Sequence, residues 1–309
     1  MHHLLKAADV RLKPDYMGRA NQYARCALVD QSVGSVHTGF GLCEIAAGGR
    51  QDLHVHSYEE SFYVAEGGPT LVLERRGYPL SPGTCGIIPV GAPHAWVGPE
   101  QGRARWLDML APQPREHGAI AHTYFLGSSS DYVDSSLDIR DPRTRHFFRI
   151  ADDDIQVDKL KIGSRVNAPT VSASMATALL AYSGIAVKML VDQRLDAALL
   201  TMFMVEYQPG GVAHPHDHPF EETYYILDGE VDAVADGQRY TLKTGDLFWT
   251  GVGSVHAFYN TSGKTVRWLE TQSPQPPLRY SYRFARDWEY LNEKATEPAI
   301  AADRVSAPR

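Results

Sequence analysis

Cysteine is scarce in this chain of 309 residues, and long apolar runs are missing from it. Cys26, Cys43 and Cys85 are widely spaced and form no Cys-x-x-Cys pair, which favours reduced, buried thiols inside a cell over a disulfide framework. No stretch is apolar over the length that crosses a membrane, and charges recur throughout MHHLLKAADVRLKPDYMGRANQY, where a signal peptide would lie. We therefore predict a cytoplasmic protein with no membrane partner.

Positive charge is also in deficit. The chain has 30 Lys and Arg against 37 Asp and Glu, a net charge of -7, and no Lys/Arg cluster stands out. Because nucleic-acid binding depends on neutralising phosphates, we expect no nucleic-acid partner. The rest of the composition, 43% hydrophobic and 22% charged, is ordinary for a folded protein, and the length suits two domains.

Two segments of the chain match at a constant offset of 162 residues. The first runs GGRQDLHVHSYEESFYVAEG and then SPGTCGIIPVGAPHAW; the second runs PGGVAHPHDHPFEETYYILDG and then KTGDLFWTGVGSVHAFYN. Six of the thirteen histidines fall in this register, which scattered surface histidines have no reason to do. The chain therefore contains one duplicated unit.

Each copy contains short apolar stretches that end at turn residues, such as SFYVAEG and AALLTMFMVEYQPGG. This pattern, without a long amphipathic helix, predicts an all-β protein made of two tandem antiparallel β-barrels or jelly rolls with a connecting segment. We expect Gly67, Gly83, Gly229 and Gly245 to adopt positive φ in turns. The predicted parts are an N-terminal barrel (1–112), a connector and packing segment (113–190), a C-terminal barrel (191–286), and a terminal helix and tail (287–309).

Three histidines and one glutamate recur in each copy with spacing that suits a metal site. Residues two apart on a strand point to the same face, so the paired imidazoles of each copy can both face a barrel interior. A glutamate follows four residues after the second histidine, and a third histidine follows later in the chain. The predicted ligands are His54, His56, Glu60 and His94 in the first copy, and His216, His218, Glu222 and His256 in the second. This nitrogen and oxygen set suits a divalent transition metal, Fe(II) or Mn(II) first and Ni, Co or Zn as alternatives, with open coordination positions.

These residues closely resemble the two sequence signatures of the cupin superfamily. Both copies match the first signature, G-x5-H-x-H-x3-E-x6-G, from Gly48 to Gly67 and from Gly210 to Gly229. The second, G-x5-P-x-G-x2-H-x3-N, is matched except that Gly98 replaces its asparagine and Gly251 its proline. Neither departure touches a ligand. The resemblance implies a bicupin in which each double-stranded β-helix holds one metal ion.

Other residues near the motifs are candidates for the surroundings of the site. His214 and Glu221 are the candidate catalytic residues; His214 shares the strand face of His216, whereas strand alternation turns Glu221 and Glu59 away and predicts that they are exposed. His214 and Asn260 make the second copy the favoured catalytic one. Aromatic residues also gather here, as barrel core or as the lining of a pocket for a ring-bearing substrate: Tyr58, Phe62, Trp96, Phe220, Tyr224, Trp249 and Phe258.

The cupin fold hosts many activities, so the site has to indicate the function. A redox-capable ion in an aromatic surround favours an oxygenase acting on a small oxygenated ring or enol substrate, as in quercetinase-like bicupins. The chain also resembles ureidoglycine aminohydrolase bicupins, whose sites have Glu and Gln where this chain has His216 and His256. A metal-assisted amidohydrolase and a non-catalytic small-ligand-binding cupin therefore remain alternatives. We expect a small-molecule substrate and a homodimer or larger homo-oligomer.

Overall fold

The computed structural model of the protein describes residues 1–115, 122–128, 131–138, 140–142, 144, 146–151, 155, 184–276 and 283–284. These residues form β-strands and short 3-10 helices, and no α-helix occurs among them. The 3-10 helices are η1 (Ala7–Asp9), η2 (Gln31–Val33) and η5 (Gln193–Leu195). The predicted C-terminal helix and tail at 287–309 lie outside the described residues.

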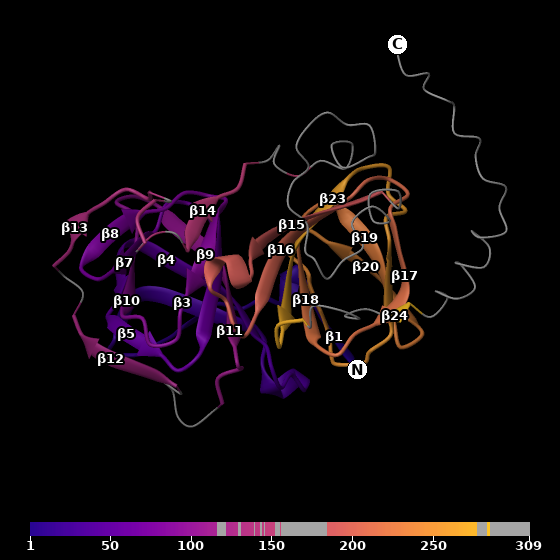
Figure 1. Ribbon diagram of the computed structural model, residues 1–309, viewed down its shortest axis with the longest axis horizontal. Helices are drawn as coiled ribbons and strands as arrows, with labels where there is room; N and C mark the ends of the chain where they lie inside the picture. The colour runs from indigo at the N-terminus through magenta and orange to yellow at the C-terminus, as the bar shows by residue number, and fades with distance from the viewer. Residues whose placement is uncertain are drawn as a thin grey trace, which may run out of the picture.

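The strands divide into two groups along the chain (Figure 1). The first group is β1 (His2–Leu5), β2 (Lys13–Pro14), β3 (Ala20–Val29), β4 (Gly39–Gln51), β5 (Leu53–His56), β6 (Glu59–Glu66), β7 (Thr70–Leu73), β8 (Arg76–Pro79), β9 (Thr84–Ile88), β10 (His94–Val97), β11 (Arg103–Ala111), β12 (Thr123–Gly127), β13 (Val133–Asp134) and β14 (Phe147–Arg149). The second group is β15 (Ile185–Val191), β16 (Thr201–Tyr207), β17 (Val212–Asp217), β18 (Glu221–Asp228), β19 (Glu230–Ala235), β20 (Gln238–Lys243), β21 (Leu247–Thr250), β22 (His256–Tyr259), β23 (Val266–Ser273) and β24 (Arg283–Phe284).

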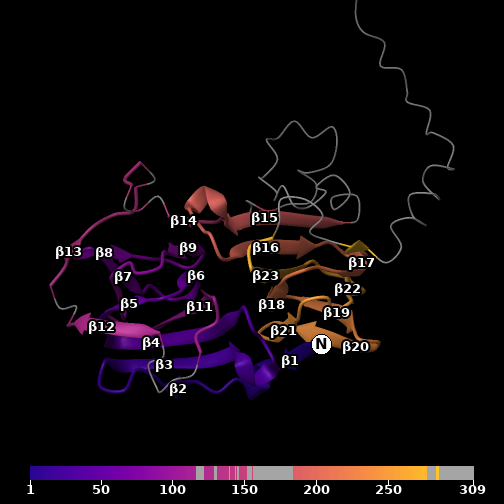
Figure 2. The same cartoon turned by 60° about the horizontal axis from the view of Figure 1, so that its bottom comes forward.

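The two groups build two β-barrels side by side, which confirms the predicted all-β tandem cupin fold (Figure 1). The C-terminal barrel packs a six-stranded sheet, ordered β1-β21-β18-β23-β16-β15, against a five-stranded one, ordered β20-β19-β22-β17-β24. Figure 2 shows the six-stranded sheet as a ladder from β15 to β1. The N-terminal barrel curls one continuous network of strands, in which β4 lies between β10 and β11.

The two barrels exchange short edge strands. The N-terminal strand β1 pairs with β21 of the C-terminal barrel, so the start of the chain lies in the second barrel (Figure 1). In return β14, which precedes the second copy, pairs with β9 of the first barrel. Each barrel therefore has one sheet edge covered by a segment from outside its own repeat.

The predicted connector supplies strands to both barrels, which changes the expected boundaries. β12 pairs with β5, and β14 with β9, so the first barrel gains strands beyond residue 112. β15 pairs with β16, so the second barrel begins before residue 191. Residues 156–183 of the predicted connector and packing segment lie outside the described residues.

Three hydrophobic clusters form the core of the described part of the chain. One fills the N-terminal barrel around Phe62 and Trp106, and a second fills the C-terminal barrel around Phe258 and Trp268. The third contains residues of both halves, including Leu28, Phe40, Leu107, Met202, Trp249 and Leu269. Because buried apolar area is the main stabilising term in folding, this shared cluster joins the barrels into one body.

The predicted turn glycines behave as expected. Gly67, Gly83, Gly229 and Gly245 have φ of 72°, 86°, 82° and 86°, in the left-handed region that glycine adopts without strain. At Gly67 the need is also steric, because an added Cβ would lie 2.2 Å from the Arg103 carbonyl oxygen.

The cysteine prediction is confirmed for two residues of three. All three cysteines are free thiols; Cys43 and Cys85 are buried, but Cys26 is only partly buried.

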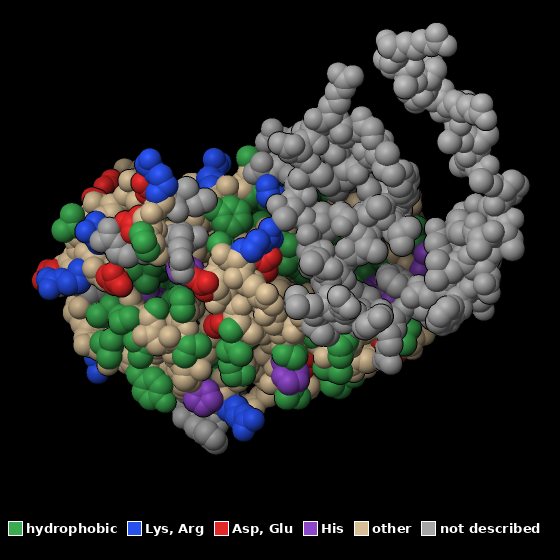
Figure 3. All heavy atoms as spheres, viewed as in Figure 1, with side chains coloured by type: hydrophobic (Ala, Val, Ile, Leu, Met, Phe, Trp, Pro, Cys, Tyr) green, Lys and Arg blue, Asp and Glu red, His purple; other side chains and the backbone are tan. Residues whose placement is uncertain are grey.

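No helix in the described part of the chain is long and apolar enough to cross a membrane. Basic and acidic side chains intermingle on the face of the N-terminal barrel seen in Figure 3.

Candidate metal centres

The N-terminal barrel brings its four predicted ligands together in its interior. His54 and His56 lie on β5, His94 on β10 and Glu60 on β6, and all four are at most 5% exposed. β5 and β10 pair with His94 directly opposite His54, which places imidazoles from distant parts of the sequence side by side. One ligand nitrogen from each histidine lies within 4.8 Å of those of the other two. Glu60 Oε2 lies 3.0 Å from His56 Nε2 and 3.5 Å from His94 Nε2.

The C-terminal barrel repeats the arrangement. His216 on β17 pairs directly with His256 on β22, and His218 and Glu222 complete a buried group whose ligand atoms all lie within 4.8 Å of one another. Glu222 Oε2 lies 2.6 Å from His218 Nε2 and 3.5 Å from His256 Nε2. The structure therefore brings together all eight residues that the sequence predicted as ligands, in two centres.

Backbone carbonyls fix the orientation of five of the six imidazoles. The Nδ1 atoms lie 2.7 to 2.9 Å from main-chain oxygens: Asp52 for His54, Ala92 for His94, His214 for His216, Phe220 for His218 and Ser254 for His256. His56 Nδ1 instead lies 3.1 Å from the Thr123 hydroxyl on β12. A carbonyl can only accept a hydrogen bond, so in these five histidines Nδ1 carries the proton and the Nε2 lone pair faces the centre, whereas the Thr123 hydroxyl can donate or accept and leaves the tautomer of His56 open.

This tautomer leaves a cluster of electron pairs that a cation would satisfy. His94 Nε2 is buried, makes no hydrogen bond, and faces Glu60 Oε2, which is also an acceptor. An extra proton on the imidazoles is disfavoured, because burial lowers the pKa of His56, holds that of His54 well below its usual value, and lowers the pKa of His216 to about 3. Burial acts to raise the pKa of Glu60, but the facing histidines outweigh it and hold this pKa well below its usual range. Three neutral imidazoles and one carboxylate fit a divalent transition metal.

The two centres differ in the residues that surround the glutamate. In the C-terminal centre Tyr224 donates its hydroxyl hydrogen to Glu222 Oε2, and Gln272 Nε2 donates to Glu222 Oε1 at 2.5 Å. The positions 162 residues earlier are occupied by Phe62 and Leu110, which make no hydrogen bond to Glu60. Glu60 thus lacks the two side-chain hydrogen bonds that Tyr224 and Gln272 donate to Glu222.

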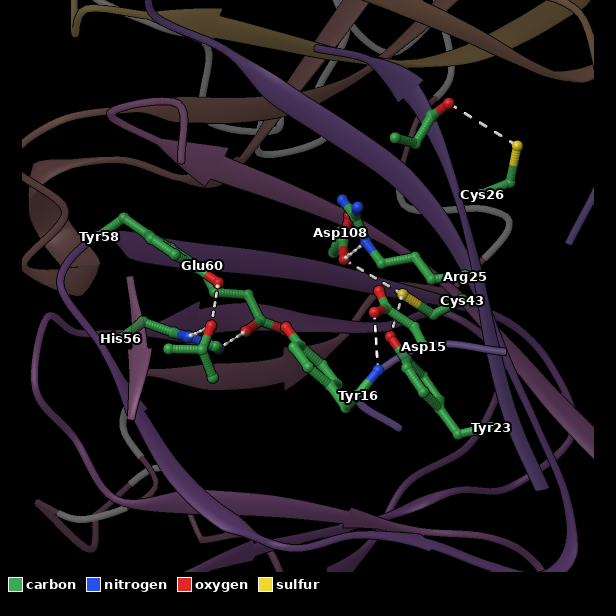
Figure 4. A network of polar contacts seen from close by, with 12 residues as sticks. Asp15, Tyr16, Tyr23, Arg25, Cys26, Cys43, His56, Tyr58, Glu60 and Asp108 are labelled. Atoms are coloured by element: carbon green, nitrogen blue, oxygen red, sulfur yellow. Dashed lines mark hydrogen bonds and ion pairs between the residues drawn. The ribbon is translucent and has the colours of Figure 1, made fainter. Parts of the chain in front are cut away.

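A small cavity adjoins the N-terminal centre. On one side His56 and Tyr58 share the Thr123 hydroxyl, beside Glu60 and Tyr16 (Figure 4). The cavity is lined by Tyr16, Tyr23, Gln51, His54, His56, Tyr58, Glu60, Trp96, Trp106, Asp108 and Leu110. Its volume is about 10 Å³, roughly the room of one water molecule, so the cavity suits a small ligand beside the centre.

A buried ion pair closes the other side of this network. Arg25 donates from Nε and Nη2 to the two oxygens of Asp108, at 2.7 Å each, and the Cys43 thiol donates to Asp108 Oδ2 at 3.1 Å. The Tyr23 hydroxyl in turn donates to Cys43 Sγ at 3.3 Å (Figure 4). Because both oxygens of Asp108 accept hydrogen bonds and Arg25 carries the opposite charge, the negative charge of Asp108 in the cavity wall is balanced.

The expectation that Glu59 and Glu221 are exposed is wrong, since they are only 4% and 2% exposed. Glu59 accepts hydrogen bonds from Ala198 N and Leu199 N of the other barrel, at 2.8 and 2.9 Å. Glu221 accepts from Ser35 Oγ and from the backbone N–H groups of residues 36–38. Strand alternation does turn both away from the ligands, but the face that they reach is covered by the partner barrel. Glu221, which we predicted to be catalytic, therefore anchors one barrel to the other.

His214 and Asn260, the two residues that favoured the second copy as the catalytic one, have other roles in the structure. The His214 side chain is exposed, and its carbonyl oxygen accepts from His216 Nδ1. Asn260 donates from Nδ2 to the carbonyls of Tyr207, Gln208 and Lys264, so its side chain stabilises a turn. Of the seven aromatic residues, Tyr58 lines the cavity, and Trp96 both lines it and belongs to the hydrophobic cluster of the N-terminal barrel. The buried Phe220 stacks on His218 at 4.1 Å. The remaining four belong to the hydrophobic clusters: Phe62, Tyr224, Trp249 and Phe258.

Comparison with known proteins agrees with this architecture. The cupin domain family matches residues 41–110 and 203–271, one match in each barrel. The chain is 25% identical over 236 residues to quercetin 2,3-dioxygenase of Bacillus subtilis, covering 69% of this chain and 68% of that protein. Among solved structures, oxalate decarboxylase of Lactobacillus farciminis has a similar fold, with a TM-score of 0.62, 15% identity, and coverage of 99% of this chain and 94% of that chain. Salicylate 1,2-dioxygenase of Pseudoaminobacter salicylatoxidans aligns with a TM-score of 0.61 and 13% identity, over 88% and 81% of the two chains. With two matched domains and two barrels, each of which gathers three histidines and a glutamate, the chain is a bicupin of the cupin superfamily.

Proposed function

We propose that this bicupin is a divalent-metal-dependent oxygenase that acts on a small oxygenated ring or enol substrate, and that turnover takes place in the N-terminal barrel. The observation that carries the proposal is the N-terminal group of three histidines and a glutamate, which adjoins a cavity lined by aromatic and polar side chains. The similarity to quercetin 2,3-dioxygenase over two thirds of both chains supports the reaction class. The expected ion is Fe(II) or Mn(II).

The protein's own residues would hold the ion and position the substrate. His54, His56 and His94 present Nε2 atoms whose rings are already oriented by Asp52, Thr123 and Ala92, so little rotamer freedom is lost on binding. The ion would supply a Lewis acid with open positions for small ligands. The hydroxyl groups of Tyr16 and Tyr58 lie in the cavity wall, where they could hydrogen-bond a small oxygen ligand, and Trp96, stacked on Trp106 at 4.5 Å, forms an apolar part of that wall. Because the cavity is only about 10 Å³, a ring substrate would have to displace part of this wall.

The assignment to the N-terminal barrel replaces the preference that the sequence gave to the second copy. That preference rested on His214 and Asn260, whose side chains are exposed and engaged in a turn, respectively. The location in the cytoplasm and a homodimeric or larger assembly remain proposals as well.

The test is oxygen uptake by protein of measured metal content with a panel of enols, catechols and flavonols. We expect uptake that depends on the bound metal, and we expect His56→Ala to lower kcat/KM by about 100-fold or more while His218→Ala retains most of it. The reverse ranking would overturn the assignment to the N-terminal barrel. Ammonia release from ureides without oxygen would instead indicate the hydrolase, carbon dioxide release from small dicarboxylates a decarboxylase, and tight ligand retention without turnover a binding protein.

A further inference from the structure

Tyr224 lies inside the C-terminal metal centre rather than beside it. It is 2% exposed, and its phenol oxygen contacts both Glu222 Oε2 and His256 Nε2, the latter at 2.7 Å. These are the two ligand atoms that face each other at 3.5 Å in the centre. The tyrosine oxygen therefore occupies space next to the point on which the ligands converge.

One proton is too few for these contacts. His256 Nδ1 faces the Ser254 carbonyl, so Nε2 presents a lone pair, and an ionised Glu222 only accepts. The hydroxyl of Tyr224 can donate to one of the two atoms but not to both. The remaining contact between electron pairs is relieved if the phenol oxygen, like its two neighbours, is close to a shared cation.

The N-terminal barrel provides an internal comparison. Residue 62 corresponds to residue 224 in the repeat, and both lie two residues after the ligand glutamate on equivalent strands, β6 and β18. Position 62 is a phenylalanine, which has no atom able to contact a ligand in this way, and it packs edge-on against Trp96 at 5.2 Å. A cavity adjoins the N-terminal centre, with Glu60 among its lining residues.

We propose that Tyr224 closes the C-terminal metal centre, with its phenol oxygen taking a coordination position that the N-terminal centre leaves open at Phe62. The C-terminal ion is then a structural ion surrounded by protein ligands, and the N-terminal ion is the one that small molecules reach. This division is the general distinction between structural sites, which are closed, and catalytic sites, which keep an open position. The inference deepens the proposed function, because it states why one barrel of two would turn over substrate.

The experiment counts exchangeable water on each centre with Mn2+ as the probe. His54→Ala/His56→Ala removes the N-terminal centre and leaves the C-terminal one, and His216→Ala/His218→Ala does the reverse. The relaxation rate of water protons per bound Mn2+ reports the water molecules on the ion. We expect a lower rate for the C-terminal centre than for the N-terminal one. Tyr224→Phe should raise the rate in the C-terminal-only protein by roughly one coordinated water, and Phe62→Tyr should lower it in the N-terminal-only protein.

The outcomes decide the inference without any measurement of turnover. Equal rates for the two centres, or a rate unchanged by Tyr224→Phe in protein that still binds Mn2+, would overturn it. If a folded Tyr224→Phe protein, checked by circular dichroism, loses Mn2+, the lost hydrogen bond to Glu222 could be the cause, and the Phe62→Tyr comparison in the N-terminal-only protein then decides: a lower rate supports the inference and an unchanged rate overturns it. If that variant does not fold, the Phe62→Tyr pair decides. A bicupin that consumes no oxygen could still show this difference, so the inference and the proposed function can fail separately.

Discussion

Six buried imidazoles, each held by a hydrogen bond on Nδ1, define the chemistry of this protein at the scale of the residue. Burial lowers the pKa of several of them, and the anchoring carbonyls select the tautomer of the five histidines other than His56. Both effects make Nε2 a neutral donor atom toward the centre. The imidazoles are therefore oriented for a cation before one binds. Because they are kept neutral in the folded protein, its stability depends on pH.

For the protein freed of metal by a chelator, we therefore expect the free energy of unfolding to depend on pH. An unfolded histidine takes up a proton below pH 6.5, whereas folded His216 resists protonation until about pH 3, and the pKa values of His54 and His56 are lowered as well. Between these limits the unfolded state binds more protons, so stability falls as the pH falls. From pH 6.5 to 5 we expect the free energy of unfolding to fall by about 2 kcal/mol for each histidine that stays neutral in the folded protein. Glu60 contributes outside this window, because its pKa is lowered from 4.5 and its contribution is lost only in stronger acid.

Urea unfolding of the metal-free protein at pH 7 and pH 5 measures this effect. The midpoint should be clearly lower at pH 5, and the difference should shrink in His54→Ala/His56→Ala, which lacks two of the groups. The same midpoint at both values would mean that the buried histidines are protonated in the folded protein.

The eight ligands could be predicted because each copy contains the same local spacing, and only a barrel is needed to bring His94 and His256 to the others. The contact of Thr123 with His56 could not be predicted, since the two residues are 67 positions apart and meet only through the pairing of β12 with β5. Glu59 and Glu221 were misjudged for a related reason. Strand alternation gives the direction of a side chain, but it does not say what covers that face.

At the scale of the element, the exchanged strands β1 and β14 show how the two barrels share their edges. Each is short, and each pairs with an equivalent strand, β21 and β9 respectively. The long apolar strands were predictable from β-branched and aromatic residues. β12, β13 and β14 were not, because they are short and pair with distant strands, which the local sequence pattern does not reveal.

The β14–β9 pairing can be tested at Gly86, which lies opposite Phe147. An added Cβ at Gly86 would lie 2.3 Å from the His146 carbonyl oxygen and 2.4 Å from Phe147 Cδ1. Gly86→Ala should therefore displace β14 and lower the free energy of unfolding by about 1–3 kcal/mol, with faster hydrogen exchange in β9. Gly263→Ala is the matched control, since nothing lies within 4 Å of its added Cβ. Equal stability of the two variants would argue against a packed β14.

At the scale of the whole molecule, the barrels are joined by a shared hydrophobic cluster and by two reciprocal anchors. Glu59 binds the N–H groups of residues 198–199, and Glu221 binds residues 35–38. Both the glutamates and the segments that they hold correspond in the repeat. Each anchor also immediately precedes a metal ligand, Glu60 or Glu222, so the interface and the centres are built on the same strands.

The anchors predict how the molecule unfolds. The Glu221 carboxylate receives four hydrogen bonds, at 2.6 to 3.2 Å, and that of Glu59 receives two. Glu221→Gln keeps one accepting oxygen and turns an NH2 group toward buried donors, so we expect a loss of about 1–3 kcal/mol and a larger effect than for Glu59→Gln.

Because the loss falls on the contact between barrels, calorimetry of Glu221→Gln should resolve two transitions where the parent shows one. Glu66→Gln is the control, since its carboxylate is half-exposed and pairs only at 3.4 and 3.8 Å with Arg103 and Arg105. If Glu221→Gln unfolds in one step at the parent temperature, the hydrophobic cluster alone couples the barrels, and the buried glutamates next to the ligands have another purpose.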